Sequence, residues 1–185
     1  MKTGSFLCAV AGLAVFAALP ALAAEAPPSP APGPEYAQLA FFAGDWTCTG
    51  KADASPMGPA HATTATVRVH KELGGFWYTG HYEEKKTAEN PHPMHFAFFW
   101  GYDSGAKVFT LDGFDAMGGR SHQTASGWQD SKLVFDGTSA GNMSPAPFRD
   151  TFTKKDDATL EHSGEMQVDG KWMHLDQETC KRVKK

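Results

Sequence analysis

The feature that most restricts the fold is a series of short alternating segments that runs from residue 45 almost to the end of the chain. These segments are rich in β-branched and aromatic residues, and turn signals such as Asn90-Pro91 and Asp169-Gly170 lie between them. The predicted strands are 45–52, 61–73, 76–86, 93–102, 106–114, 119–126, 131–138, 147–154, 158–168 and 171–181. Their near-constant spacing, without helical crossovers, predicts an antiparallel up-and-down sheet.

A sheet of about ten strands either closes into a barrel or leaves two exposed edges, and closure removes those edges. Cys48 lies on the first predicted strand and Cys180 on the last. These strands are neighbours only in a closed barrel, and a disulfide needs Cβ atoms about 4 Å apart. We therefore predict an all-β antiparallel barrel with a Cys48–Cys180 disulfide. Two free thiols are the alternative.

Residues 1–24 have the pattern of a secretory signal peptide. Lys2 precedes an apolar run over 6–19, and Ala21-Leu-Ala-Ala24 supplies the small residues that a signal peptidase reads. The run is shorter than the roughly 18 to 20 residues that cross a bilayer, which disfavours the alternative of a membrane anchor. We expect cleavage near Ala23 or Ala24, export to the periplasm or secretion, and no membrane anchor afterwards. Cleavage also removes Cys8 and leaves an even pair of cysteines.

The rest of the chain is predicted to be one domain behind a linker. Residues 25–34 carry proline at five of ten positions, which is typical of an extended spacer. Apolar residues at 36, 39, 40 and 43 have helical spacing and stop before Gly44, so one short helix is predicted there. The domain is expected over 35–185.

Charge argues against nucleic acid as a partner. The chain has 17 basic residues, of which Lys2 leaves with the signal peptide, against 21 acidic ones. Basic residues cluster at Lys154-Lys155 and in the tail over 181–185, and a terminal cluster of this kind is usually solvated. The composition therefore offers no support for binding to nucleic acid or to anionic lipid.

Aromatic residues concentrate on two neighbouring predicted strands. Alternation places Phe76 and Tyr78 on one face of the first strand, and Phe98 and Trp100 on one face of the second. Such a wall either fills the core or lines a cavity, and both interpretations stay open. Trp46 is expected to plug one end of the interior.

The last strand allows two opposite orientations. If Cys180 shares the inner face with His174, Asp176 and Glu178, the barrel contains an acidic patch with one histidine. The opposite parity places Met173 and Leu175 inside and the charges in water. Buried carboxylates are costly unless they are paired, but alternation alone does not decide between the two.

Motifs for catalysis or metal binding are weak. His92 and His95 form a short pair without a further ligand at a convincing spacing, so no metal site is predicted. The sequence contains no Gly-x-Ser-x-Gly motif, phosphate-binding loop or dinucleotide fingerprint. No catalytic residue is assigned.

Several short motifs resemble, in order, those of a bacterial family of unknown function, the DUF1579 proteins. They are Gly44-Asp-Trp46, Leu73-Gly-Gly-Phe-Trp77, Gly101-Tyr-Asp103, Phe114-Asp115, Gly127-Trp128, Leu133-Val-Phe-Asp-Gly137 and Lys181-Arg182. The resemblance spans roughly residues 38 to 182 and implies a lipocalin-like barrel without an agreed activity. A more distant similarity is to nitrobindin-type barrels, which bind haem through a histidine near the end of the chain, where His174 is the only comparable residue.

The sequence thus predicts an exported, non-catalytic barrel that binds a small apolar or amphipathic molecule. The candidate ligand-binding residues are Trp46, Phe76, Tyr78, Phe98, Trp100 and His174. No cofactor is predicted. A haem-binding barrel and an enzyme on a lipocalin-like scaffold are the two alternatives.

Overall fold

A computed structural model describes residues 29–141 and 144–184. The predicted signal peptide and residues 25–28 of the proline-rich linker lie outside the described residues. The segment Ala31–Lys185 forms one compact unit.

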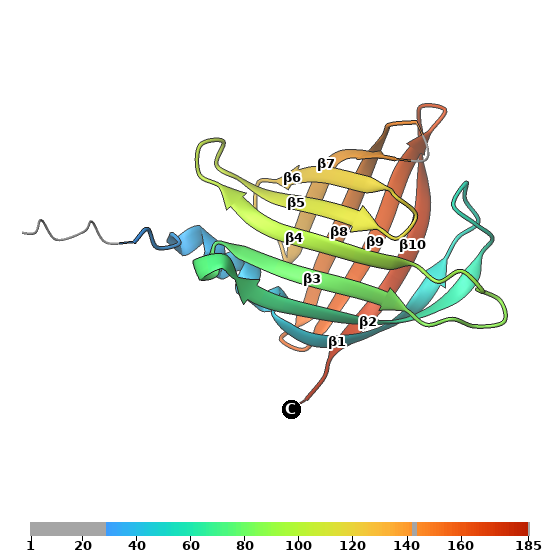
Figure 1. Ribbon diagram of the computed structural model, residues 1–185, viewed down its shortest axis with the longest axis horizontal. Coiled ribbons are helices and arrows are strands. Elements are labelled where there is room, and N and C mark those ends of the chain that lie inside the picture. The colour runs from blue at the N-terminus through green and yellow to red at the C-terminus, as the bar shows by residue number, and fades with distance from the viewer. Residues whose placement is uncertain (1–28, 142–143, 185) are drawn as a thin grey trace, which may run out of the picture. The chain divides into compact units, whose positions relative to one another are not determined.

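Ten antiparallel strands close into a barrel in which each strand pairs with its neighbours in the sequence, and the last pairs with the first (Figure 1). The strands are β1 (Gly44–Ala52), β2 (His61–Glu72), β3 (Trp77–Glu84), β4 (His95–Asp103), β5 (Val108–Asp115), β6 (Arg120–Ala125), β7 (Lys132–Ala140), β8 (Ala146–Asp156), β9 (Thr159–Val168) and β10 (Lys171–Arg182). The predicted fold class is confirmed, because closure satisfies the backbone groups that an open sheet would expose at its edges.

The predicted helix is a 3-10 helix, η1 (Pro34–Phe42), and a second short 3-10 turn, η2 (Leu73–Gly75), precedes β3. A 3-10 helix has three residues per turn, so residues three apart lie above one another. Leu39 and Phe42 have this spacing and are both fully buried. The burial therefore follows a period of three rather than the period of 3.6 that the sequence indicated.

The closing pair of strands carries the predicted disulfide. Cys48 of β1 is directly opposite Cys180 of β10, and the two sulfur atoms are 2.00 Å apart. Both cysteines are buried among core residues, and Trp46 lies on the same face of β1. The bond thus joins the two ends of the sheet from inside the barrel.

The inner face is built around two glycines that make room for aromatic rings. A Cβ atom at Gly80 would lie 2.1 Å from the ring of Phe98, and one at Gly113 would lie 2.0 Å from the ring of Phe96. Rings from β4 therefore lie against the backbones of β3 and β5, at positions where any side chain larger than hydrogen would collide with them.

A β-bulge in β10 decides which of its side chains face inward. The register shifts between His174 and Asp176, so that Met173 is opposite Met166 while Asp176 is opposite Gly164. A bulge adds one residue and reverses the alternation beyond it. Leu175 is therefore buried together with Glu178 and Cys180, while Asp176 is half-buried on the inner face, a combination that neither simple parity predicted.

Candidate ligand site inside the barrel

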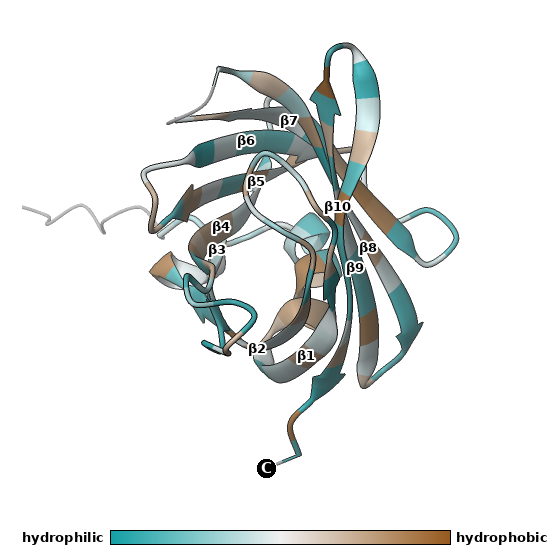
Figure 2. Cartoon of the chain, turned by 90° about the vertical axis from the view of Figure 1, so that its right-hand side faces the viewer, coloured by the Kyte–Doolittle hydropathy of each residue, from teal (hydrophilic) through white to brown (hydrophobic). Residues whose placement is uncertain are grey.

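The barrel interior divides into an aromatic half, next to η1, and a polar half. Figure 2 looks along the barrel from the end opposite η1 and shows the ring of strands around its interior. In the aromatic half the ring of Phe42 lies 4.2 Å from that of Trp100 and 5.3 Å from that of Phe152. The Trp46 indole donates a hydrogen bond of 2.9 Å to the Phe42 carbonyl. Side chains fill this half.

Most of the predicted lining residues belong to this packed half. Trp46, Tyr78, Phe98 and Trp100 are each at most 6 % exposed and form one core cluster. Their burial agrees with the core interpretation of the aromatic wall. Contact between them and a ligand stays a prediction.

Phe76 does not join this wall, because β3 begins one residue later at Trp77. Its ring lies edge-on to Tyr36 of η1, with centroids 5.5 Å apart. Both residues line a solvent-open hollow of about 400 Å³ that also includes Tyr102 and Lys107.

The polar half is centred on His162 of β9. Its Nε2 lies 2.8 Å from Oδ1 of Asp150 on β8, and its Nδ1 lies 3.2 Å from Oδ1 of Asp176 on β10. The imidazole thus spans two carboxylates from the strands on either side. Its side chain remains 22 % exposed, so solvent reaches this part of the inner face.

The two carboxylates control the protonation of His162. Burial by itself would lower its pKa, but the hydrogen bonds and charges of Asp150 and Asp176 outweigh burial and raise the pKa well above 6.5. The ring is therefore an imidazolium at neutral pH and donates to both carboxylates.

Glu178 lies next to this cluster on β10 and is almost fully buried. Tyr82 of β3 donates a hydrogen bond of 2.9 Å to its Oε1. Burial raises the pKa of Glu178, although Thr63, His162 and Tyr82 act in the opposite direction. The pKa of the Tyr82 phenol is raised by burial and by the Glu178 charge, so the phenol stays a donor.

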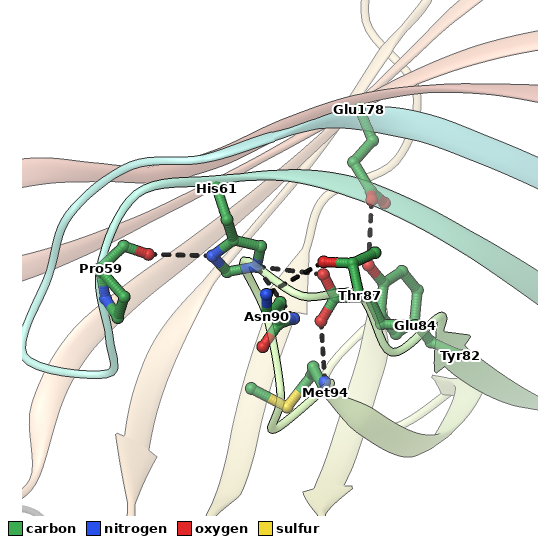
Figure 3. A network of polar contacts seen from close by, with 8 residues as sticks. All are labelled: Pro59, His61, Tyr82, Glu84, Thr87, Asn90, Met94 and Glu178. Atoms are coloured by element: carbon green, nitrogen blue, oxygen red, sulfur yellow. Dashed lines mark hydrogen bonds and ion pairs between the residues drawn. The ribbon is translucent and has the colours of Figure 1, made fainter.

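A second polar network lies beside the first, where the segment after β3 returns to β4 (Figure 3). His61 Nε2 lies 3.1 Å from Glu84 Oε1 and 3.1 Å from the amide nitrogen of Asn90. The backbone N–H of Met94 donates to the other oxygen of Glu84. These contacts hold residues 85–94 against β2 at this end of the barrel.

His174, the histidine singled out from the sequence, does not lie on the inner face with Asp176 and Glu178. The bulge turns it away, and its Nδ1 lies 2.8 Å from Oδ2 of Asp53, with both side chains more than a third exposed. The orientation in which His174 shares the inner face with Asp176 and Glu178 is therefore not the one that the structure has. His162 occupies the acidic environment that this orientation would have given to His174.

Alternation contained a signal for this cluster that the sequence analysis did not use. Leu160, His162, Gly164 and Met166 alternate along β9, and Phe148, Asp150 and Phe152 alternate along β8. A polar residue within an apolar alternation points to a buried polar site. The signal does not give the register between the strands, so it does not say which carboxylates lie beside His162.

Polar atoms without a partner lie on the inner face of β6. Gln123 is fully buried, and its amide nitrogen donates to the Phe135 carbonyl, while its Oε1 has no hydrogen-bond partner. Ser121, two residues along on the same face, is 9 % exposed, and its hydroxyl also lacks a partner. Buried polar groups are nearly always satisfied, so these two atoms call for an explanation.

The geometry gives little support to a metal. Over 29–141 and 144–184, one group of three potential ligand atoms lies within 4.8 Å, from Cys48, Cys180 and Glu178. The disulfide uses both sulfur atoms, which leaves one carboxylate.

Comparison with known proteins agrees with the fold. A sequence profile described as "Protein of unknown function (DUF1579)" matches residues 31–182. The crystal structure of Rv2717c from M. tuberculosis superposes with a TM-score of 0.61 over 82 % of this chain and 99 % of that chain, at 13 % identity. This likeness concerns the fold alone. No curated protein sequence matches the chain. No helix among the described residues is long and apolar enough to cross a membrane.

Proposed function

The chain belongs to the DUF1579 family, which is described as a family of unknown function, and on this premise we propose that the barrel is a non-catalytic binding protein for a small amphipathic molecule. The ligand would enter the polar half of the barrel. Its polar group would contact the side chains around His162, and its apolar part would contact the aromatic core.

The observation that carries this proposal is the division of the inner face. The aromatic half is filled by Phe42 and its neighbours, whereas several inward residues of the polar half keep part of their surface exposed. These include Tyr82, Phe96, Phe148 and His162. A surface that offers rings beside carboxylates and hydroxyls suits a molecule with both apolar and polar parts.

The state of His162 favours binding over acid–base catalysis. A general base needs a ring nitrogen with a free lone pair within reach of the substrate. Both nitrogens of His162 are engaged by carboxylates, and the raised pKa keeps the ring protonated. The same contacts with the carboxylates disfavour binding of haem by His162, because a protonated imidazole has no lone pair for iron.

We also propose that the protein acts outside the cytoplasm. The signal-peptide pattern of residues 1–24 supports this location. The Cys48–Cys180 disulfide agrees with it, because such bonds persist in oxidising compartments.

The site can be tested by filling it. Ala52 lies on the inner face between His61 and Asp176, whereas its neighbour Lys51 faces outward and is exposed. We expect Ala52→Phe to weaken binding of the neutral fluorescent probe N-phenylnaphthylamine by about tenfold, which is about 1.4 kcal/mol. Lys51→Phe, the matched control, should bind as the wild type does.

Melting curves of both variants exclude a folding defect, and Ala52→Leu serves as a smaller block if Ala52→Phe does not fold. The proposal is wrong if the wild type binds no probe, or if both positions affect binding equally.

A further inference from the structure

We propose that the ligand carries a protonated primary amine, which the inward carboxylates and amide oxygen of the polar half select. This inference rests on the proposed function and names the polar group of its ligand.

The first argument is an excess of negative charge on the inner face. Four carboxylates lie in the polar half, from Glu84, Asp150, Asp176 and Glu178, against the two imidazoles of His61 and His162. One imidazole pairs with Glu84, and the other is shared by Asp150 and Asp176. The two imidazoles therefore supply at most two positive charges for the four carboxylates.

Among residues 29–141 and 144–184, no lysine or arginine forms an ion pair with these four carboxylates. Lys154 and Arg182 have the inward register but lie at the end next to η1, and Lys171, which has it at the opposite end, is exposed. Lys154 pairs with Asp157 at 2.8 Å, and Arg182 donates to the carbonyls of Phe41 and Ala43. The excess negative charge of the polar half remains.

Burial makes the excess of negative charge costly, so a bound cation would stabilise the polar half. Glu178 is 4 % exposed, and its neutral neighbour Tyr82 donates one hydrogen bond to it. Its raised pKa reflects the cost of an incompletely compensated buried carboxylate. A bound cation would offset that cost and would lower the pKa of Glu178 again.

Gln123 provides an independent argument for a hydrogen-bond donor. The bond from its amide nitrogen to the Phe135 carbonyl orients the amide, so its Oε1 is an acceptor without a donor in a fully buried position. Gly137 of β7 lies opposite Gln123 of β6 and opposite Phe148 of β8, two residues from Asp150, and adds no side chain between them. The side chain of Gln123 thus lies on the same inner face of the barrel as the carboxylates.

An ammonium group fits these acceptors better than other cations do. A primary amine carries three N–H donors when protonated, whereas a quaternary ammonium carries none and binds through aromatic faces. Phe96 and Phe148, which are partly exposed on the inner face, and the buried Met166 offer apolar contacts for the rest of the molecule.

Matched eight-carbon probes test the head group in the full mature chain. Octylamine, octanol, octanoate and octyltrimethylammonium each compete with N-phenylnaphthylamine at pH 7. We expect octylamine to displace the probe at a concentration about tenfold lower than the other three compounds do. Glu178→Gln and Gln123→Leu should weaken octylamine alone, while Asp112→Asn, on the outer face beside His122, should change nothing.

The outcomes separate the two proposals. If the probe binds but octanol, octanoate or octyltrimethylammonium competes as well as octylamine, the amine inference is overturned and the proposed function stands. If the wild type does not bind the probe, the proposed function fails. If Glu178→Gln does not fold, the response of Gln123→Leu decides the inference.

Discussion

At the scale of single residues, His162 shows how neighbouring strands define the chemistry of a side chain. Its two partners are 12 and 14 positions away in the sequence, yet they flank it because β8 and β10 lie on either side of β9. His174 has carboxylates two and four positions along its own strand and contacts neither of them. Neighbouring strands, and not proximity along the sequence, therefore determine which carboxylates contact His162.

The raised pKa of His162 predicts a pH dependence of stability. The folded protein holds this proton more tightly than the unfolded chain, whose histidine pKa is about 6.5. The contribution is fully present below about pH 6.5 and is lost as the pH rises through the folded pKa. We expect the free energy of unfolding in urea to fall from pH 6 to pH 9.

His162→Gln should flatten this dependence over the same range. His122→Gln is the matched control, because His122 pairs with Asp112 on the outer face and is mostly exposed. A wild-type profile that is already flat, or one that both substitutions flatten equally, would contradict the assignment.

At the scale of elements, η1 and the bulged β10 decide what the barrel can contain. The period of three in η1 stacks Leu39 on Phe42 and places both against the core. Beyond the bulge in β10, Asp176 and Glu178 face inward. Before it, Met173 also faces inward, and Leu175 at the bulge is buried. One element closes the aromatic half, and the other makes the opposite half acidic.

The role of η1 as a plug predicts a large effect of Phe42→Ala. Removal of a fully buried phenylalanine costs about 3 to 5 kcal/mol of unfolding free energy, through lost transfer energy and the cavity that remains. Phe99→Ala is the control, because Phe99 faces outward on β4 and is 37 % exposed. Chemical denaturation measures both, and equal losses would show that Phe42 does not plug the barrel.

At the scale of the whole molecule, closure depends on the contact between β1 and β10. Seven residue pairs join these strands, and the disulfide links them at Cys48 and Cys180. A closed barrel hydrogen-bonds both edges of every strand, so it offers no template for pairing with another chain. The disulfide makes that closure covalent.

The disulfide and the proposed export can be tested on protein isolated from the periplasm. Intact-mass measurement should give a chain that begins near Glu25 and whose two cysteines resist alkylation. Reduction should lower the unfolding free energy by up to about 5 kcal/mol, since the bond closes a loop of 132 residues on the chain-entropy model. A full-length chain would contradict export, and two alkylated thiols before reduction would contradict the disulfide.

The sequence by itself determined the ten strands, their order around the barrel and the cysteine pair, because alternation and turn chemistry are local signals. Only the tertiary structure decided which half of the interior is filled and which histidine joins the carboxylates. Those outcomes depend on one extra residue in β10 and on contacts between β8, β9 and β10. A bulge reverses alternation without a local mark in the residues around it, and the register between neighbouring strands, which sets the cross-strand partners of His162, is not a local signal either.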